Sequence, residues 1–379
     1  MDKVRFGDVV KRVNIYVDRF NTDRLYYVGK GGSIEPDALD IKPQAKIEGA
    51  TIGFKFHFGF EPGHILFMSR CFDQHKAATA TFRGVCSDST YVVETRDNNV
   101  LLQQYLQLVM QTDDFWNWCE EHKSGGVNFL INYSTLETYE FDLPSIEEQK
   151  VLADKLWAAY RVKESYRQLL STTDEMLKAK FQEMFRTKET WQSMKLKDIV
   201  DPNCPISYGI VQPGEELEEG VPIVRPVDLN SELYVYRRGL KNTSETISNS
   251  YKRTILRGDE LLMCVRGTTG VMGIATEELK GCNVTRGITP LFFKEGINRF
   301  YVLCVFLSDE IQQFIKDHTI GSTLKGINMS IVRDIDVPIA TKEIQDEFER
   351  VFTQAEATKA SLRSSIEAID RVIRSLINQ

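Results

Sequence analysis

The sequence predicts an α+β protein: two globular α/β domains related by an internal repeat and separated by two long helices that form an antiparallel coiled coil. Two observations predict this fold. The phrase HKSGGVNFLINYS at 122–134 recurs 196 residues later as HTIGSTLKGINMS, with His, Gly, Ile, Asn and Ser at matching places. Each copy leads into a proline and then into a long stretch without Gly or Pro. A repeat on this scale governs the whole fold.

The repeat extends over both globular domains. RFGDVV near the start parallels KLKDIV at 195–200, and PGHILFM at 62–68 parallels RGDELLM at 257–263. Tyr105 and Tyr301 each open an apolar helical stretch before the repeated His. Short strand-like runs then end at Pro144 and Pro338, where a proline stops a ladder. We therefore expect a domain at 1–143, a helix at 144–187, a second domain at 188–337 and a second helix at 338–379.

Both long stretches carry the pattern of a coiled coil. Ser145 with Glu148 three residues later forms a capping box that predicts where the first helix starts. Steps of four and three residues from Leu152 to Met184, and from Phe348 to Leu376, meet mostly apolar side chains. A helix of about 40 residues is on the order of 60 Å long and cannot bury such a seam alone. Its sequence twin is the expected partner; the alternative is that each helix packs on its own domain.

Composition places the chain among ordinary globular proteins. It has 379 residues, 42% of them hydrophobic and 27% charged. The apolar run YVLCVFL at 301–307 is too short to span a bilayer, and charges stand where a signal peptide needs apolar residues, so we expect a cytoplasmic protein. The seven cysteines form no C-x-x-C pair, which favours reduced core residues and no metal site.

Net charge argues neither for nor against nucleic acid. The total is −7, yet binding depends on where the charges lie. Because no segment is strongly basic, DNA binding would need a local basic face or a partner that adds positive charge.

Catalytic signatures are missing from the sequence. GKGGS at 29–33 lacks the spacing of a P-loop, and RGTTGVMG at 266–273 lacks that of a dinucleotide fingerprint. There is no G-x-S-x-G elbow and no H-E-x-x-H zinc motif. These observations indicate a binding protein with no catalytic residues of its own.

Several longer motifs carry a family resemblance over nearly the whole chain. They are YVGKGGSIEPDALDI at 27–41, ISYGIVQPGEE at 206–216, VPIVRPVDL at 221–229, LRGDELLMCVRGTTG at 256–270, IGSTLKGINMSIVRDIDVP at 320–338 and the helix opening LPSIEEQKVL at 143–152. In this order and duplication they resemble the DNA specificity subunit of a type I restriction–modification system. One departure is Ile344, which stands where the first helix has Glu148.

The resemblance implies a non-catalytic subunit that reads double-stranded DNA. Each globular part would be a target-recognition domain for one half of a bipartite target, and the helices would set the gap between the halves. Two methyltransferase subunits would dock on the chain and restriction–translocase subunits could join them. S-adenosylmethionine, ATP and Mg²⁺ would bind those partners, and no cofactor is expected in this chain.

Candidate DNA contacts are polar residues in glycine-flanked loops, because Arg and Lys suit guanine and phosphate. In the second domain they are Arg225, Arg266, Thr268, Thr269, Arg286, Ser322, Thr323 and Lys325; in the first they are Ser69, Arg70, Gln74, Lys76 and Ser124. His122 and His318 are expected to end helices, where an imidazole N–H can satisfy a terminal carbonyl.

Two other functions fit the pattern. One is the specificity subunit of a type IIB restriction–modification system, whose partner fuses methyltransferase and nuclease. The other is a coiled-coil scaffold protein that does not bind DNA.

Overall fold

The computed structural model describes residues 2–19, 21–29, 34–70, 72–186, 191–229, 233–321 and 325–378. The chain forms two compact units. Unit 1 consists of Met1–Leu169 and Ser361–Gln379, and unit 2 of Leu170–Ala360. Each unit therefore holds one globular part together with one end of each long helix.

Unit 1 is built from two five-stranded sheets, a strand pair and short helices. The first sheet has the order β2 (Val10–Arg12), β11 (Thr90–Thr95), β8 (Ile65–Met68), β9 (Ala77–Ala80), β5 (Asp40–Ile41), and the second β3 (Ile15–Tyr16), β7 (Phe56–Phe60), β10 (Gly84–Ser87), β4 (Tyr26–Val28), β6 (Ala45–Lys46). The pair is β1 (Asp2–Arg5) with β12 (Glu140–Leu143), and the helices are α1 (Phe6–Val9), α2 (Gln103–Val109), α3 (Asp113–Glu121) and α4 (Tyr133–Leu136).

Unit 2 repeats this plan with fewer strands. Its sheets have the orders β16 (Lys241–Thr243), β14 (Val221–Val224), β19 (Asn283–Val284), and β15 (Tyr234–Val235), β18 (Met272–Ala275), β17 (Leu261–Cys264), β20 (Ile288–Leu291). Two strand pairs are β13 (Gln192–Lys195) with β23 (Asp336–Ile339), and β21 (Thr319–Ile320) with β22 (Gly326–Ile327). The helices are α6 (Leu196–Ile199), α7 (Glu245–Asn249), α8 (Arg299–Phe306), α9 (Asp309–Asp317) and α10 (Met329–Arg333).

The central strand of each unit is buried on both faces. In β8, Ile65 and Phe67 belong to one core and Leu66 and Met68 to another. The same alternation divides β17, where Leu261 and Met263 face one core and Leu262 and Cys264 the other. Side chains alternate across a strand, so an unbroken apolar run such as ILFM or LLMC needs cover on both sides.

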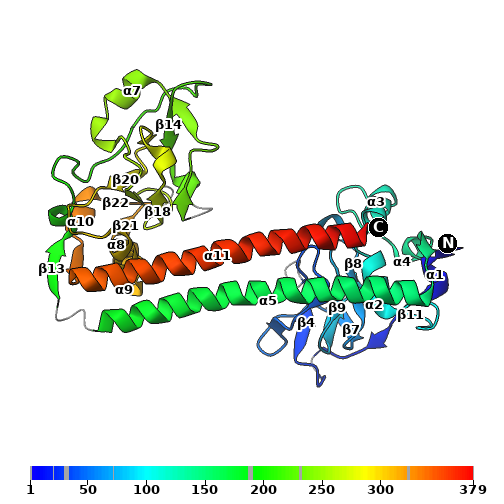
Figure 1. Ribbon diagram of the computed structural model, residues 1–379. Helices are drawn as coiled ribbons and strands as arrows, with labels where there is room; N and C mark the ends of the chain where they lie inside the picture. Colours follow the sequence, from blue (N-terminus) through cyan, green and yellow to red (C-terminus); the bar gives the residue numbers. More distant parts are fainter. Residues whose placement is uncertain are drawn as a thin grey trace. The chain divides into compact units, whose positions relative to one another are not determined.

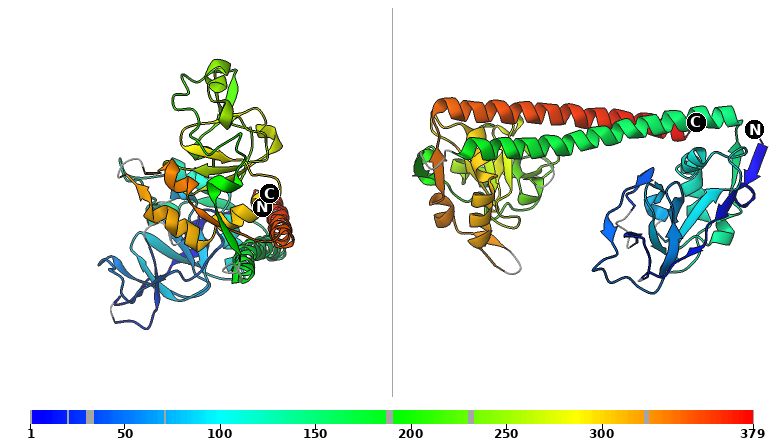
Figure 2. Two further views of the ribbon diagram at one scale, coloured as in Figure 1. Left: turned by 90° about the vertical axis from the view of Figure 1, so that its left-hand side faces the viewer. Right: turned by 90° about the horizontal axis from the view of Figure 1, so that it is seen from below.

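The two long helices are α5 (Ile146–Met184) and α11 (Lys342–Ile377). They run antiparallel: Lys163 meets Asp370 at 2.5 Å in unit 1, and Lys359 meets Asp174 at 2.8 Å in unit 2. Figures 1 and 2 show α5 (green) beside α11 (red) within each unit. The predicted antiparallel pair is confirmed, and so is the start of α5, since the Ser145 N–H and hydroxyl both donate to the Glu148 carboxylate and the Glu148 N–H donates to the Ser145 hydroxyl.

Each helix also packs on a globular core, so the two packing alternatives are both realised. Leu156 and Tyr160 of α5 are buried in the core of unit 1, and Ile373 of α11 joins them there. In unit 2 the buried Phe348 of α11 stacks on Phe181 of α5. The end of each helix thus completes the core of the unit formed by the other repeat.

Equivalent hydrogen bonds confirm the internal repeat. The buried Gln149 side chain accepts from the Leu102 N–H and donates to the Pro144 carbonyl, at 2.9 Å each. Gln345 does the same with the Asn298 N–H (2.8 Å) and the Ala340 carbonyl (3.0 Å). Both glutamines join the start of a long helix to the start of the helical hairpin before it, because a buried polar side chain must find partners.

The repeated histidines end helices as predicted. His122 caps α3 and His318 caps α9. Each ring Nδ1 lies against the carbonyl four residues earlier, at 2.9 Å from Trp118 and 2.8 Å from Phe314, and each ring packs on the aromatic side chain of that residue. Gly125 and Gly321 follow with φ of 103° and 110°, a backbone conformation that favours glycine. Each copy of the repeated phrase therefore begins at a helix end, continues through a glycine with positive φ, and finishes in the first turn of a short helix, α4 or α10.

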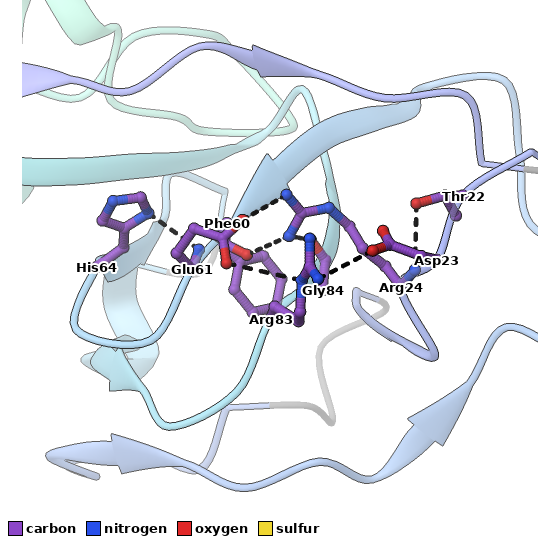
Figure 3. Close-up of polar contacts among 8 residues, drawn as sticks. All are labelled: Thr22, Asp23, Arg24, Phe60, Glu61, His64, Arg83 and Gly84. Carbon is purple, nitrogen blue, oxygen red and sulfur yellow. Dashed lines mark hydrogen bonds and ion pairs between the residues drawn. The ribbon is translucent and has the colours of Figure 1, made fainter.

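A buried arginine ties three segments of unit 1 together (Figure 3). Arg24 donates to the Phe60 carbonyl and to the Glu61 carboxylate, both at 2.6 Å. Arg83 reaches Asp23 at 2.9 Å and Glu61 at 3.7 Å, and the Glu61 N–H donates to Nδ1 of His64 at 3.1 Å. This cluster lies where β7 ends and β10 begins, and it satisfies backbone carbonyls that would otherwise be unpaired.

Candidate nucleic-acid interface

In unit 2, three loops are joined by backbone hydrogen bonds at one edge. They are the loop after β17, the turn before β20, and the loop around β21 and β22. Val265 N–H donates to the Gly287 carbonyl at 2.8 Å, Ile327 N–H to the Val265 carbonyl at 3.0 Å, and Gly267 N–H to the Lys325 carbonyl at 2.8 Å. We call this edge the loop edge of unit 2. It gathers residues that lie up to 62 positions apart in the sequence, from Val265 to Ile327. Because backbone groups make these hydrogen bonds, the side chains of the loops can vary.

Two arginines of the loop edge share one aromatic ring. The guanidinium of Arg266 lies 5.6 Å from the centre of the Tyr208 ring, and that of Arg286 lies 5.7 Å from it. Tyr208 is held beside β19, since the Ile210 N–H donates to the Val284 carbonyl and Ile210 in turn accepts from the Arg286 N–H. Gly209 allows this close approach, because a Cβ there would lie 2.2 Å from the Val284 carbonyl oxygen. We call Tyr208, Arg266 and Arg286 the Tyr208 cluster.

The remaining candidates at this edge surround the cluster. Thr268 and Lys325 are exposed, and the hydroxyls of Thr269 and Thr319 are 2.9 Å apart. Thr269 and Lys325 line a polar cavity of about 640 Å³ together with Gln312, Gln313 and Lys316. Ser322 and Thr323 lie outside the described residues.

Arg225 differs from the other arginines. Its guanidinium meets the Asp228 carboxylate through Nε at 3.1 Å and Nη2 at 2.8 Å, and its own N–H also donates to Asp228. The hydrogen bond to Asp228 raises the pKa of Arg225. A guanidinium whose fork is already occupied by a carboxylate has fewer donors for another ligand.

Unit 1 builds an equivalent loop edge. Ser69 N–H donates to the Ser89 carbonyl at 3.0 Å, and Ile131 N–H donates to the Ser69 carbonyl at 3.1 Å. Ser69 thus matches Val265, and Arg70 occupies the place of Arg266. Ser124 and Leu130 exchange backbone hydrogen bonds across the third loop.

The unit 1 candidates divide by exposure. Arg70 and Gln74 are exposed, and Ser124 is half-buried, accepting from the Asn132 amide at 3.2 Å. Ser69 and Lys76 are buried, and the Ser69 hydroxyl donates to the Ser89 carbonyl. The structure therefore brings Ser69, Arg70 and Ser124 to one edge, with two of the five candidates facing inward.

Two functional candidates escaped sequence reasoning. Tyr208 belongs to the motif ISYGIVQPGEE, and an aromatic residue beside a glycine was the available signal. Arg12 lies over three rings of unit 1, at 4.6 Å from Tyr91, 5.3 Å from Phe58 and 5.6 Å from Tyr133. Nothing in its neighbourhood in the sequence signals this, because the three rings come from distant segments.

The described ranges hold no group of three His, Cys, Asp or Glu side chains that could bind a metal ion. Their six cysteines are free, and burial raises the pKa of the Cys86 thiol to about 12. No helix in these ranges is long and apolar enough to cross a membrane.

Comparison with known proteins gives a consistent result. Residues 188–371 match the family described as the type I restriction modification DNA specificity domain. The EcoBI type I restriction enzyme specificity subunit of Escherichia coli is 24% identical over 279 residues, which are 65% of this chain and 58% of that protein. The MjaIX type I restriction enzyme specificity subunit of Methanocaldococcus jannaschii is 23% identical over 191 residues, 49% of this chain and 42% of that protein. The chain thus spans about half the length of these relatives.

The fold has a solved counterpart. The crystal structure of a type I restriction–modification system S subunit from M. genitalium superposes with a TM-score of 0.60, covering 99% of this chain and 94% of that one at 13% identity. At this identity the likeness concerns the fold.

Proposed function

We propose that this chain, which belongs to the family of type I restriction–modification DNA specificity subunits, reads a bipartite target in double-stranded DNA. Each unit reads one half of the target through its loop edge, and α5 with α11 sets the gap. The observation that carries the proposal is the duplicated loop edge. Unit 1 presents Arg70 where unit 2 presents Arg266, on loops joined by the same backbone hydrogen bonds.

The proposed division of labour follows the repeat. Residues 1–143 and 188–337 are the two target-recognition domains, and 144–187 and 338–379 are the helical spacers. All thirteen candidate contacts belong to the recognition domains. We assign base and phosphate contacts first to the exposed and half-buried candidates other than Arg225, whose guanidinium Asp228 occupies, namely Arg70, Gln74, Ser124, Arg266, Thr268, Thr269, Arg286 and Lys325. Ser69 and Lys76, which are buried, are assigned to holding the loop edge.

The arginine-bearing loop edges supply local positive charge in a chain whose net charge is −7. Such a chain needs partners to enclose DNA, since phosphate neutralisation dominates affinity. We propose that two methyltransferase subunits dock on it and that restriction–translocase subunits join them. The chain is then a non-catalytic subunit, and S-adenosylmethionine, ATP and Mg²⁺ bind the partners.

Long-read methylation sequencing tests the proposal. The host genome is compared with and without this gene, or a methylation-free strain receives the gene with its neighbouring methyltransferase gene. The expected result is a single bipartite adenine motif that depends on this chain. Methylation that does not change would contradict the proposal and favour the coiled-coil scaffold. A bipartite motif made by a partner that fuses methyltransferase and nuclease would assign the chain to a type IIB system.

A further inference from the structure

The Tyr208 cluster holds two cations over one aromatic ring. Among the residues that the structure describes, neither Arg266 nor Arg286 forms an ion pair with a carboxylate. Other arginines of unit 2 are paired: Arg225 with Asp228, and Arg257 with Asp201. Two guanidiniums over one ring repel each other, so the cluster favours a ligand rich in acceptor atoms.

Arg266 is the member of the pair placed to meet such a ligand. It lines a cavity of about 350 Å³ together with Tyr208, Gly321 and Asn328. Its backbone forms a β-bridge with Gly326, and Gly267 beside it has φ of +83°, where an added Cβ would meet no atom of the described residues within 4 Å. The main chain of Arg266 is therefore fixed, and a bulky ligand can approach it closely.

The fixed geometry matters for the kind of ligand. A guanidinium offers a rigid fork of N–H donors, and stacking on an aromatic face orders that fork before binding. On duplex DNA the group that matches a fork with two acceptors on one edge is guanine, through O6 and N7 in the major groove. A phosphate can also accept from both arms of the fork, although the point charge of a Lys suffices there, so the test must separate a guanine from a phosphate.

We propose that Arg266 reads a guanine in the half-site assigned to unit 2 and that Tyr208 is the positioning residue for its guanidinium. The inference rests on the proposed function and deepens it, because it predicts the chemistry of one target base. The half-site that changes when residues 188–337 are exchanged must then contain a guanine or its paired cytosine at the position read by Arg266.

The test uses the complex of the full chain with its methyltransferase subunits and a duplex carrying the motif found by methylation sequencing. Arg266→Ala should weaken binding of this duplex by roughly 5- to 150-fold, the range for losing a bidentate contact to guanine. Replacing the guanine with 7-deazaguanine removes only the N7 acceptor and should weaken wild-type binding by about 3- to 10-fold. The Arg266→Ala complex should not distinguish the two duplexes.

Matched variants separate the hydrogen-bonding fork of Arg266 from its charge, and the aromatic face of Tyr208 from its size. Arg266→Lys keeps the charge without the fork and should lose discrimination against 7-deazaguanine. Tyr208→Phe keeps the aromatic face and should retain discrimination, whereas Tyr208→Leu should lose part of it. Arg70→Ala in unit 1 should leave discrimination at this guanine unchanged.

Three results would overturn the inference. Equal weakening of all duplexes by Arg266→Ala, with a salt slope reduced by about 1, would make Arg266 a phosphate contact. An unchanged motif in the Arg266→Ala complex would remove it from the interface. If the wild-type complex bound no duplex specifically, the proposed function and this inference would fail together, whereas specific binding with either of the first two results would sink the inference alone.

Discussion

The two units join their loops with the same backbone bonds and place different side chains on them. The turn that accepts from Ser69 in unit 1 is Asp88–Ser89, and the turn that accepts from Val265 in unit 2 is Arg286–Gly287. Asp88 faces Lys55 at 3.8 Å, whereas Arg286 lies over Tyr208. One equivalent place therefore carries opposite charges. Backbone hydrogen bonds preserve the edge, so its chemistry can change without refolding the unit.

A second difference concerns the sheet beside that turn. In unit 1 β10 is flanked by β7 and then by β3, and in unit 2 a single bridge from Ile210 to Thr285 occupies the corresponding edge. The added strands bring Tyr16, which is 73% exposed, parallel to His57 with a ring separation of 6.2 Å. Unit 1 therefore offers an aromatic surface where unit 2 offers cations; under the proposed function, the two units should read their half-sites differently.

Exchanging a whole recognition domain is the strongest test of this comparison. Under the proposed function, replacing residues 1–143 with a recognition domain of a type I specificity subunit should replace one half of the methylated motif and leave the other half unchanged. Exchange of 188–337 is the matched control and should change the opposite half. Methylation sequencing measures both. A change in both halves, or in neither, would contradict the assignment of one half-site to each unit.

The buried ring of Phe348 gives the largest expected effect on stability. It packs against Phe181, Phe185 and Tyr301. Phe348→Ala should lower the free energy of unfolding by about 3–5 kcal/mol, because it leaves a cavity. The repeat places the half-buried Leu152 at the matching position of α5, and Leu152→Ala should cost less than about 2 kcal/mol. Chemical denaturation of the purified variants measures the difference; equal losses would show that the two cores are packed alike.

The paired glutamines should behave as equals. Gln149→Ala and Gln345→Ala each leave a backbone N–H, of Leu102 or Asn298, without its acceptor. We expect each to lower the free energy of unfolding by about 1–3 kcal/mol. Gln354→Ala, at an exposed position of α11, is the control and should change it little. A large decrease in the free energy of unfolding for one variant and none for the other would contradict the equivalence of the two glutamines.

The helix starts should differ, because only the first has a capping box. Ser145→Ala removes the hydroxyl that bonds both the carboxylate and the N–H of Glu148, keeps the bond from the Ser145 N–H, and should cost about 1 kcal/mol. Ile344 occupies the place of Glu148 in the second helix, so Thr341→Ala should cost less. Hydrogen exchange of the first-turn amides of α5 and α11 distinguishes the two. Similar losses of amide protection in Ser145→Ala and Thr341→Ala would show that the Glu148 carboxylate contributes nothing to the helix start.

The smallest expected effect is a pH dependence confined to unit 1. Burial lowers the pKa of His64, and the carboxylates of Glu94 and Glu61 oppose this only in part. The folded state therefore binds its proton less readily than the unfolded chain, whose histidine titrates near about 6.5. Stability of unit 1 should fall as the pH drops below that value.

His64→Asn provides the control for this titration. An asparagine side chain can still accept from the Glu61 N–H and does not titrate in this range. Hydrogen exchange of unit 1 amides between pH 7 and pH 5.5 should show less acid sensitivity in the variant. The same sensitivity in both proteins would assign the effect to another group.

Local patterns predicted the elements well. The capping box at Ser145 placed the start of α5, the absence of Gly and Pro predicted both long helices, and the repeated histidines were expected at helix ends. Each of these features is decided by neighbours within a few residues. They are therefore visible in the sequence itself.

The loop edge of unit 2 could be predicted only in part. Arg266 and Arg286 were candidates because of their loops, but Tyr208 joins them from 58 and 78 positions away, and no local pattern records that contact. Arg225 has the same side chain in a similar loop, and only the structure reveals that Asp228 occupies its guanidinium. The sequence also did not predict that the end of each long helix packs into the core formed by the other repeat, since an apolar seam does not specify which core it enters.

The antiparallel pairing of α5 and α11 also constrains how this protein can be lengthened. The residue numbers of the two cross-helix ion pairs, 163 with 370 and 174 with 359, add to 533 in each case. Residues inserted into α5 between positions 163 and 174 break this constant sum unless α11 gains the same number between 359 and 370. Both ion pairs are kept only if the two helices gain the same number of residues, at two places far apart in the gene. Under the proposed function, a new target spacing therefore requires two matched insertions, and a chain with only one of them would lose one of the ion pairs.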